Sequence, residues 1–105
     1  MNLAMSKYRA VKTTVDNITF DSKREAARYC ELKLLLRAEK IRNLEIQPKF
    51  NFRLDGDRIF TYRADFAYFD DDERIIEDVK GVRTPVYRLK KKIIEKAFNV
   101  RIVEI

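Results

Sequence analysis

Two apolar segments that each end on charged residues constrain the fold of this chain more than any other feature. The first runs from Phe60 to Phe69 and the second from Ile75 to Gly81, on either side of the acidic residues 70–74. Aromatic and β-branched residues are frequent in both, which predicts two adjacent strands joined by a solvated acidic turn. A calcium loop is the alternative interpretation of this turn, but the glycine and the final glutamate of such a loop are missing.

The side chains of these two strands are expected to alternate between the faces of a sheet. Asp78 and Lys80 then share one face with Ile76, and Glu77 and Val79 lie on the other. The first strand divides in the same way into two sets on opposite faces: Asp65, Ala67 and Phe69, and Tyr62, Ala64 and Phe66. Two acids and a lysine near strand ends can converge on one small volume, as a metal-dependent phosphodiesterase requires. A salt bridge at a strand end is the alternative.

Length and composition limit the classes of protein that the chain can represent. A chain of 105 residues with 46% hydrophobic residues predicts a single domain, residues 1–105, with one core. The net charge of +6 indicates a polyanionic partner, nucleic acid first, although an ordinary basic protein is the alternative. The sequence has no histidine, which excludes Ser–His hydrolases, His-based nucleases and nearly all zinc enzymes.

A reducing compartment suits the chain, because Cys30 is its one cysteine and no internal disulfide can form. No stretch approaches the ~20 apolar residues of a membrane span, so we expect no membrane partner. The N-terminus lacks an apolar signal region, and we therefore expect a cytoplasmic protein. No motif points to a small-molecule cofactor.

The order of the expected elements predicts an α/β (α+β) fold with a central mixed β-sheet flanked by helices. In chain order they are a hairpin, a helix, three antiparallel strands, a second helix and a final strand: residues 11–20, 22–40, 49–54, 58–69, 75–80, 84–98 and 99–105. The second helix permits a crossover that adds the final strand in parallel. Its core stripe is expected to consist of four apolar residues: Val86, Leu89, Ile93 and Ala97.

Glu25 allows two interpretations. It completes a capping box with Ser22, in which the acid reaches back to the Ser22 amide. It also starts an inward-facing stripe that continues through Tyr29, Leu32 and Leu36. An unpaired acid in such a stripe costs several kcal/mol, and a bound cation would remove that cost. Glu25 is therefore a candidate metal ligand as well as a capping residue.

Two basic segments are candidate DNA contacts. An N-terminal arm carries Lys7 and Arg9, which can lie along a phosphate backbone or belong to a frayed terminus. The remaining DNA-binding candidates lie in the helix over residues 84–98 or directly before it: Arg83, Tyr87, Lys90, Lys91 and Lys92. Clustered charge close to a candidate active site indicates phosphate contacts. A merely solvated helix face is the alternative.

Phosphodiester hydrolysis can be assigned to the charged residues of the two central strands. Mg²⁺ prefers carboxylate oxygens, and Asp65 and Asp78 would hold it, with Mn²⁺ as a substitute. Lys80 would orient the attacking water and neutralise developing charge, since neighbouring acids favour its charged form. Gln47, directly before Pro48, can orient a water or a phosphate.

The arrangement of Asp65 with Asp78-Val79-Lys80 resembles the PD-(D/E)XK nuclease superfamily, with Ala64 at the position of that motif's proline. Glu25 matches the acid that many members, including archaeal Holliday junction resolvases, contribute from the helix before the sheet. Gln47-Pro48 resembles a pair seen in transposon-end nucleases of this superfamily. The layout of nearly the whole chain is similar to that of small phage-encoded proteins assigned to it.

The resemblance implies a restriction-endonuclease-like αβββαβ core with an N-terminal hairpin. Asp65 and Asp78 would be metal ligands, joined by the Val79 carbonyl and by Glu25, and Lys80 would be the superfamily lysine. Products with 5′-phosphate and 3′-hydroxyl ends are implied, as are a homodimer and a phage or prophage origin in a bacterial cytoplasm. Branched or replicating phage DNA is the implied substrate.

Two other functions compete with a Mg²⁺-dependent DNA endonuclease. A non-catalytic DNA-binding module would keep the nuclease fold and the basic helix, and its affinity would depend steeply on salt. A small interaction protein whose charges only cover its surface would show no salt-sensitive DNA affinity.

Overall fold

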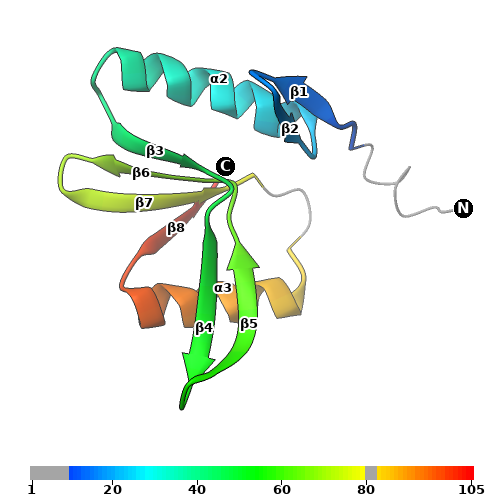
Figure 1. The fold of residues 1–105 in the computed structure, drawn as a ribbon, viewed down its shortest axis with the longest axis vertical. Coiled ribbons are helices and arrows are strands. Elements are labelled where there is room, and N and C mark those ends of the chain that lie inside the picture. Colours follow the sequence, from blue (N-terminus) through cyan, green and yellow to red (C-terminus); the bar gives the residue numbers. More distant parts are fainter. Residues whose placement is uncertain (1–9, 80–82) are drawn as a thin grey trace, which may run out of the picture.

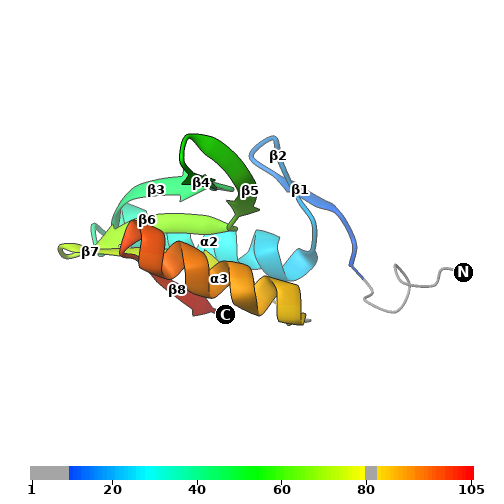
Figure 2. The same cartoon turned by 90° about the horizontal axis from the view of Figure 1, so that it is seen from below.

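The computed structural model describes residues 10–79 and 83–105, and places α2 and α3 on opposite faces of a central sheet (Figures 1 and 2). The helices and strands of the described chain have these bounds: β1 Thr13–Val15, β2 Ile18–Phe20, α2 Lys23–Arg37, β3 Arg42–Ile46, β4 Lys49–Leu54, β5 Asp57–Arg63, β6 Phe66–Asp70, β7 Glu73–Asp78, α3 Pro85–Phe98 and β8 Arg101–Glu104. The predicted N-terminal hairpin is confirmed, because Asp16 and Asn17 both adopt the positive φ of a tight turn.

The central sheet has the strand order β3-β6-β7-β8. The first three strands pair antiparallel, and β8 joins β7 in parallel after the α3 crossover. This arrangement confirms the predicted α/β class, the mixed sheet between helices and the parallel final strand.

A kinked hairpin replaces the predicted strand order between the helices. β3 continues into β4, and β5 returns into β6. The β4–β5 pair therefore forms a separate antiparallel hairpin that projects past the central sheet (Figure 1). The bend falls at Gln47, which has a φ of +54°, and Pro48, which cannot donate to a ladder. The prediction that residues 49–54 enter the central sheet was therefore wrong, and the unpredicted strand Arg42–Ile46 takes that place.

The same bend corrects the predicted assignment of side chains to faces. β5 ends at Arg63 and β6 begins at Phe66, so the period of two is interrupted between them. Phe66 packs under α2, whereas Tyr62 and Ala64 pack on the α3 side together with Ala67. The expected grouping of Tyr62, Ala64 and Phe66 on one face was wrong for this reason.

The buried face of α3 differs from the predicted stripe. Val86 and Leu89 are 61% and 60% exposed, while Ile94 is fully buried in the α3-side core, against which the half-buried Tyr87 packs. The helix carries two apolar stripes, and its contacts with β4, β5 and β8 select the one that contains Ile94. The sequence period alone could not choose between them, because it does not specify where neighbouring elements lie.

The first helix begins as predicted and ends earlier. The Ser22 hydroxyl accepts a hydrogen bond from the Glu25 amide (3.1 Å). α2 ends at Arg37 in a Schellman motif, in which the Glu39 amide donates to the Leu36 carbonyl and the Lys40 amide to the Leu35 carbonyl. Glu39 takes the left-handed position that glycine usually fills, with a φ of +61°, and the missing glycine explains the misplaced end.

Replacing Glu39 by glycine is therefore expected to stabilise the protein by about 0.5–1 kcal/mol, because glycine removes the left-handed strain of a side chain. Urea unfolding followed by circular dichroism measures the change. The matched control is Ala38→Gly, one residue earlier at a φ of −81°, which should destabilise instead. If both substitutions stabilised the protein, or both destabilised it, this account of the helix end would be contradicted.

Candidate functional site

Asp65 lies at the point where the kinked hairpin leaves the central sheet. Its backbone is held on both sides, because its amide donates to the Glu77 carbonyl (3.0 Å) and its carbonyl accepts from the Gln47 amide (2.8 Å). Asp65 is 9% exposed, and its Oδ2 accepts from the Val79 amide (2.7 Å). The bend thus fixes the Asp65 carboxylate at the end of β7.

Asp78 is the last residue of β7 and is 1% exposed. Its Oδ2 accepts a hydrogen bond from the Tyr62 hydroxyl, which comes from the end of β5. Burial, together with this bond, raises the pKa of the Tyr62 hydroxyl, so Tyr62 remains a donor to the carboxylate. Tyr62 was not predicted as a site residue; its position two residues before Ala64 was interpreted only as apolar packing.

Glu25 is 8% exposed and lies near Asp65 at the N-terminal end of α2. Its Oε2 accepts from the Ser22 hydroxyl (3.2 Å). Burial, followed by the negative charges of Asp65 and Asp21, raises the pKa of Glu25 from 4.5 to about 7. Within the described chain no Lys or Arg forms an ion pair with Glu25. The structure therefore brings Glu25 close to a second acid, Asp65, and Glu25 itself has no ion-pair partner within the described residues.

The other face of β7 shows how a buried acid is compensated in this fold. Glu77 is 1% exposed and receives two hydrogen bonds from Arg28, at 2.8 Å from Nε and 2.6 Å from Nη2. The Tyr68 hydroxyl donates to the same carboxylate at 2.5 Å. Sequence reasoning missed this network, although two successive acids on a buried strand indicate that each needs a partner on its own face.

The donor types at this end of the sheet suit a hard cation. Glu25 and Asp65 concentrate negative charge at one place, Asp78 directly precedes Val79, and carboxylate and carbonyl oxygens are the ligands of Mg²⁺. Among residues 10–79 and 83–105, no three His, Cys, Asp or Glu side chains are already grouped closely enough for a complete metal site. The residues present fit a divalent cation in their chemistry.

The remaining predicted catalytic residues lie apart from these acids or outside the described chain. The Gln47 side chain donates to the Thr19 carbonyl (3.2 Å), so it is turned toward β2, and the Gln47 backbone amide donates to the Asp65 carbonyl. Lys80, Lys7 and Arg9 lie outside the described residues.

The predicted DNA-binding residues of α3 separate onto two sides of the helix. Lys90 lies over the Phe60 ring of the hairpin, 5.3 Å from its centroid. Arg83 and Lys91 instead approach Glu104 of β8, at 2.6 Å and 3.7 Å. Tyr87 is half-buried against the Tyr62 ring, with the ring centroids 6.4 Å apart, and Lys92 is exposed.

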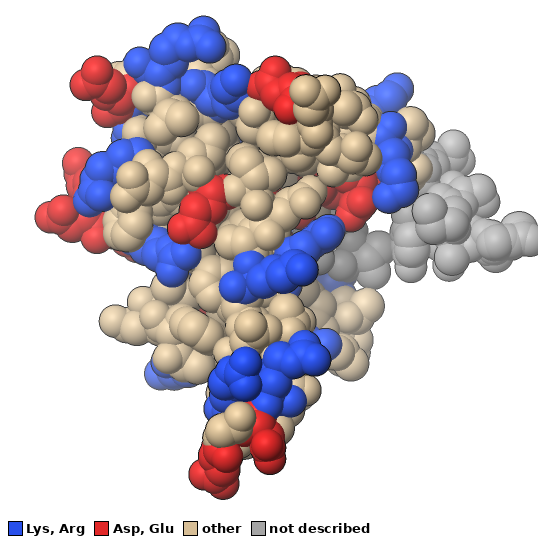
Figure 3. All heavy atoms as spheres, viewed as in Figure 1, with Lys and Arg blue, Asp and Glu red and all other residues tan. Residues whose placement is uncertain are grey.

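Basic side chains also cover the projecting hairpin. In Figure 3 the lower part of the molecule shows Lys and Arg side chains over the hairpin with acids at its tip. Arg53 and Arg58 are exposed on its strands, and Asp55 and Asp57 lie at the turn. The acids at the tip make the strands, rather than the turn, the favourable surface for a polyanion.

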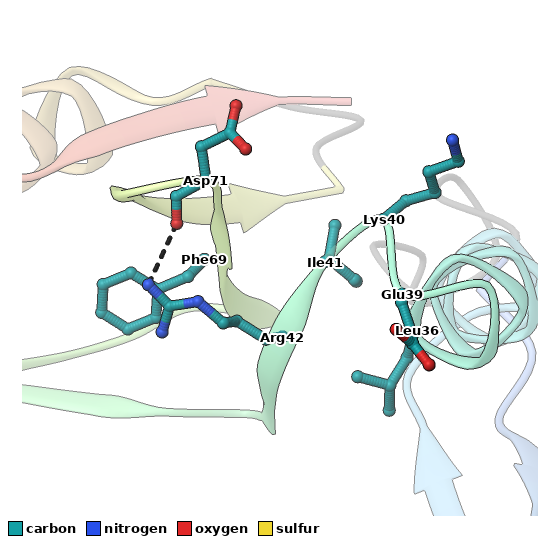
Figure 4. Close-up of a pocket in the computed structure, with 7 residues that line it drawn as sticks. All are labelled: Leu36, Glu39, Lys40, Ile41, Arg42, Phe69 and Asp71. Atoms are coloured by element: carbon teal, nitrogen blue, oxygen red, sulfur yellow. Dashed lines mark hydrogen bonds between the residues drawn. The ribbon is translucent and has the colours of Figure 1, made fainter.

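A pocket of about 450 Å³ lies at the opposite end of α2 from Glu25. It is lined by residues of the helix end, β3 and the β6–β7 turn (Figure 4): Leu36, Glu39, Lys40, Ile41, Arg42, Phe69 and Asp71. Arg42 crosses it, donating to the Asp71 carbonyl (3.0 Å) with its guanidinium 4.7 Å from the Phe69 ring centroid. A 15-residue helix is about 22 Å long, so this pocket is separate from the acids.

The uncompensated Glu25 carboxylate should make stability depend on pH. Because the pKa of about 7 in the folded protein exceeds the ordinary 4.5, folding takes up a proton. In metal-free buffer the stability of the wild type should therefore rise as pH falls from about 8 to about 5. Glu25→Gln should stabilise the protein by about 1–3 kcal/mol at pH 8 and remove much of this slope.

Urea unfolding at several pH values, with EDTA present, measures this effect. The control is Asp72→Asn on the exposed β6–β7 turn, which should change stability by less than about 0.5 kcal/mol. A loss of stability in Glu25→Gln at pH 8 would show that Glu25 serves mainly as a capping residue.

Comparisons with known proteins give one match. Residues 5–104 match the family model described as a protein of unknown function, DUF1064. No curated protein and no solved structure matches the chain significantly. Within the described residues no helix has the length and apolar character needed to cross a membrane. Because the match extends over almost the whole sequence, the chain belongs to the DUF1064 family.

Proposed function

We propose that this protein is a Mg²⁺-dependent endodeoxyribonuclease that hydrolyses phosphodiester bonds to leave 5′-phosphate ends. The observation that carries the proposal is the buried Glu25 carboxylate beside Asp65. Within the described chain Glu25 forms no ion pair, and burial together with the charge of Asp65 raises its pKa to about 7. On β7, by contrast, the fold compensates Glu77 fully through Arg28 and Tyr68. A buried acid with a pKa perturbed like that of Glu25 is typical of functional sites.

The order of the central elements supports the proposal. Without the projecting β4–β5 hairpin, the chain after the N-terminal hairpin runs α2, β3, β6, β7, α3, β8, which is an αβββαβ order. This order accords with the PD-(D/E)XK resemblance of Asp65 and Asp78-Val79-Lys80. One fold can host many functions, so catalysis is inferred here from the acids and not from the fold.

In this proposal four groups would hold the cation: the carboxylates of Asp65, Asp78 and Glu25, and the Val79 carbonyl. When bound, Mg²⁺ neutralises phosphate charge and acidifies the attacking water. Tyr62 orients the Asp78 carboxylate through its hydrogen bond. The Gln47 amide positions Asp65. Lys80, two residues beyond Asp78, would orient the water and stabilise the developing charge.

A cleavage assay tests the proposal. Supercoiled plasmid, linear duplex and a four-way junction are incubated side by side with Mg²⁺, Mn²⁺ or EDTA. Cleavage that requires the metal is the expected result, and preference for the junction would support a role on branched phage DNA. Salt-sensitive binding without cleavage of any substrate would instead favour a non-catalytic DNA-binding module, for which the basic α3 is the supporting observation.

Thermal unfolding gives a readout that is independent of activity. Mg²⁺ at 10 mM should raise the Tm of the wild type at pH 8, because a ligand that binds the folded state stabilises it. The increase should be smaller in Glu25→Gln, which replaces one proposed ligand with a weaker one. An equal Mg²⁺ shift in both proteins would contradict the assignment of Glu25 to the metal site.

The proposal includes a homodimer in a bacterial cytoplasm, supported by the resemblance and by the composition. Two active sites in a dimer would cut the two strands of a duplex. Sedimentation velocity at micromolar concentration measures the oligomeric state, and a monomer with full activity would contradict this part of the proposal.

A further inference from the structure

A pocket of about 290 Å³ that is lined by charged residues lies between α3 and β8, on the side of α3 that faces away from Phe60. Four cations and two carboxylates line it: Arg83, Arg88, Lys91, Lys92, Glu95 and Glu104. The excess of positive charge makes it a candidate site for an anion.

The two carboxylates of this pocket are already engaged. Glu95 Oε2 accepts from the Ile102 amide (3.0 Å), which ties α3 to β8. Glu104 pairs with Arg83 (2.6 Å) and with Lys91 (3.7 Å). Arg88 and Lys92 are exposed and form no ion pair with any residue of the described chain. These two cations lie four positions apart on the helix and line the pocket, and neither forms an ion pair with the described residues.

The pocket is adjacent to the strand that carries Asp78. β8 pairs in parallel with β7, and Glu104 is the register partner of Asp78. Neighbouring strands lie about 4.8 Å apart. Tyr87, at the start of α3, stacks on Tyr62, whose hydroxyl holds the Asp78 carboxylate. The pocket and the candidate site are therefore joined through packed side chains.

We propose that this pocket binds one backbone phosphate of the DNA, beside the phosphate that is cleaved. Arg88 and Lys92 are its direct ligands, since a guanidinium and an ammonium together suit phosphate oxygens. Glu104 restrains Arg83 and Lys91 and thereby limits the affinity of the pocket. The inference rests on the proposed function for the identity of the ligand, and it assigns roles to Arg88 and Glu104 that the nuclease proposal does not require.

Binding of a fluorescent duplex by the full-length protein, measured by anisotropy in EDTA at several salt concentrations, tests the inference without cleavage. The double variant Arg88→Gln/Lys92→Gln should weaken binding about 10-fold. The slope of log K against log salt should fall by about one, because both residues contact the same phosphate. Two independent phosphate contacts would lower it by about two, which would overturn the single-site geometry.

Matched charge changes outside the pocket provide the controls. Arg37→Gln/Lys96→Gln removes the same net charge from exposed positions of α2 and α3 and should weaken binding less than 3-fold. Glu104→Gln should strengthen binding about 3-fold. Its control is Glu73→Gln, which removes a carboxylate that pairs with Arg101 and should have a smaller effect on binding. Equal effects of pocket and control variants would overturn the inference.

Two further arms distinguish the possible sources of the phosphate and the two proposals. Duplexes with 5′-phosphate and 5′-hydroxyl ends should bind equally, and stronger binding of the phosphorylated end would show that the pocket takes a terminal phosphate instead. If the protein cleaves DNA in Mg²⁺ but the pocket variants behave like their control variants, this inference is overturned and the nuclease proposal stands. If the pocket variants weaken DNA binding more than their controls but no cleavage occurs, the nuclease proposal alone is overturned. If the protein shows no salt-dependent DNA binding at all, this inference is overturned.

Discussion

Asp78→Asn is expected to lower the rate of DNA cleavage at least 100-fold, which corresponds to about 3 kcal/mol of transition-state stabilisation. An amide is a poor ligand for Mg²⁺ in place of a carboxylate, and it cannot neutralise the cation. Asparagine has the same shape, and its carbonyl can still accept the bond from the Tyr62 hydroxyl at this buried position. The fold should therefore survive the substitution.

Initial rates on the preferred DNA substrate in 10 mM Mg²⁺ measure this prediction, and the Tm verifies folding. Asp72→Asn is the control, since its side chain is fully exposed on the β6–β7 turn and should leave the rate within 2-fold of the wild type. Retention of the wild-type rate in a folded Asp78→Asn protein would eliminate the proposed mechanism. If Asp78→Asn loses both the cleavage rate and the folded state, the proposed mechanism is tested instead with Asp65→Asn in the same assays.

Arg28→Met is expected to destabilise the protein by about 3–5 kcal/mol. Glu77 is 1% exposed, and Arg28 supplies the cation that pairs with it in two hydrogen bonds. Removal of the guanidinium would leave a buried carboxylate whose charge only the Tyr68 hydroxyl contacts. A domain of this size is stabilised by only about 5–15 kcal/mol, so the substitution should consume a large part of the total.

Urea unfolding at pH 7 measures this loss. Glu77→Gln in the Arg28→Met background should recover much of it, because a neutral amide does not need the cation and can still accept from Tyr68. Arg37→Met, at the exposed end of the same helix, is the control and should change stability by less than about 0.5 kcal/mol. A loss below about 1 kcal/mol in Arg28→Met would mean that the pair is hydrated and weak.

The contrast between the two groups of acids is the basis of the functional argument. Glu77 lies in a compensated network, which is the expected arrangement for a residue that only stabilises the fold. Glu25 lies near Asp65 and has no such ion-pair partner within the described residues. Burial, followed by the charge of Asp65, raises the pKa of Glu25 to about 7. A fold that retains a buried acid with such a raised pKa is consistent with a site for a cation.

Local sequence signals determined several parts of the fold. The Asp16-Asn17 turn, the Ser22 cap and the strands on either side of the acidic turn were predicted because each depends on a few neighbouring residues. The parallel final strand followed from the crossover rule. Among the site residues, the sequence indicated Glu25, Asp65 and Asp78 through charges at the ends of apolar segments.

The tertiary structure alone decided the bend at Gln47-Pro48, the buried stripe of α3 and the partners of the buried acids. Each depends on contacts between residues far apart in the chain, such as Gln47 with Asp65, or Tyr62 with Asp78. Ile94 is buried in place of Val86 and Leu89 because β8 and the projecting hairpin lie on its side of the helix. Hydrophobic periodicity identifies a possible buried face, but burial depends on which neighbour covers that face, and this is a property of the folded chain.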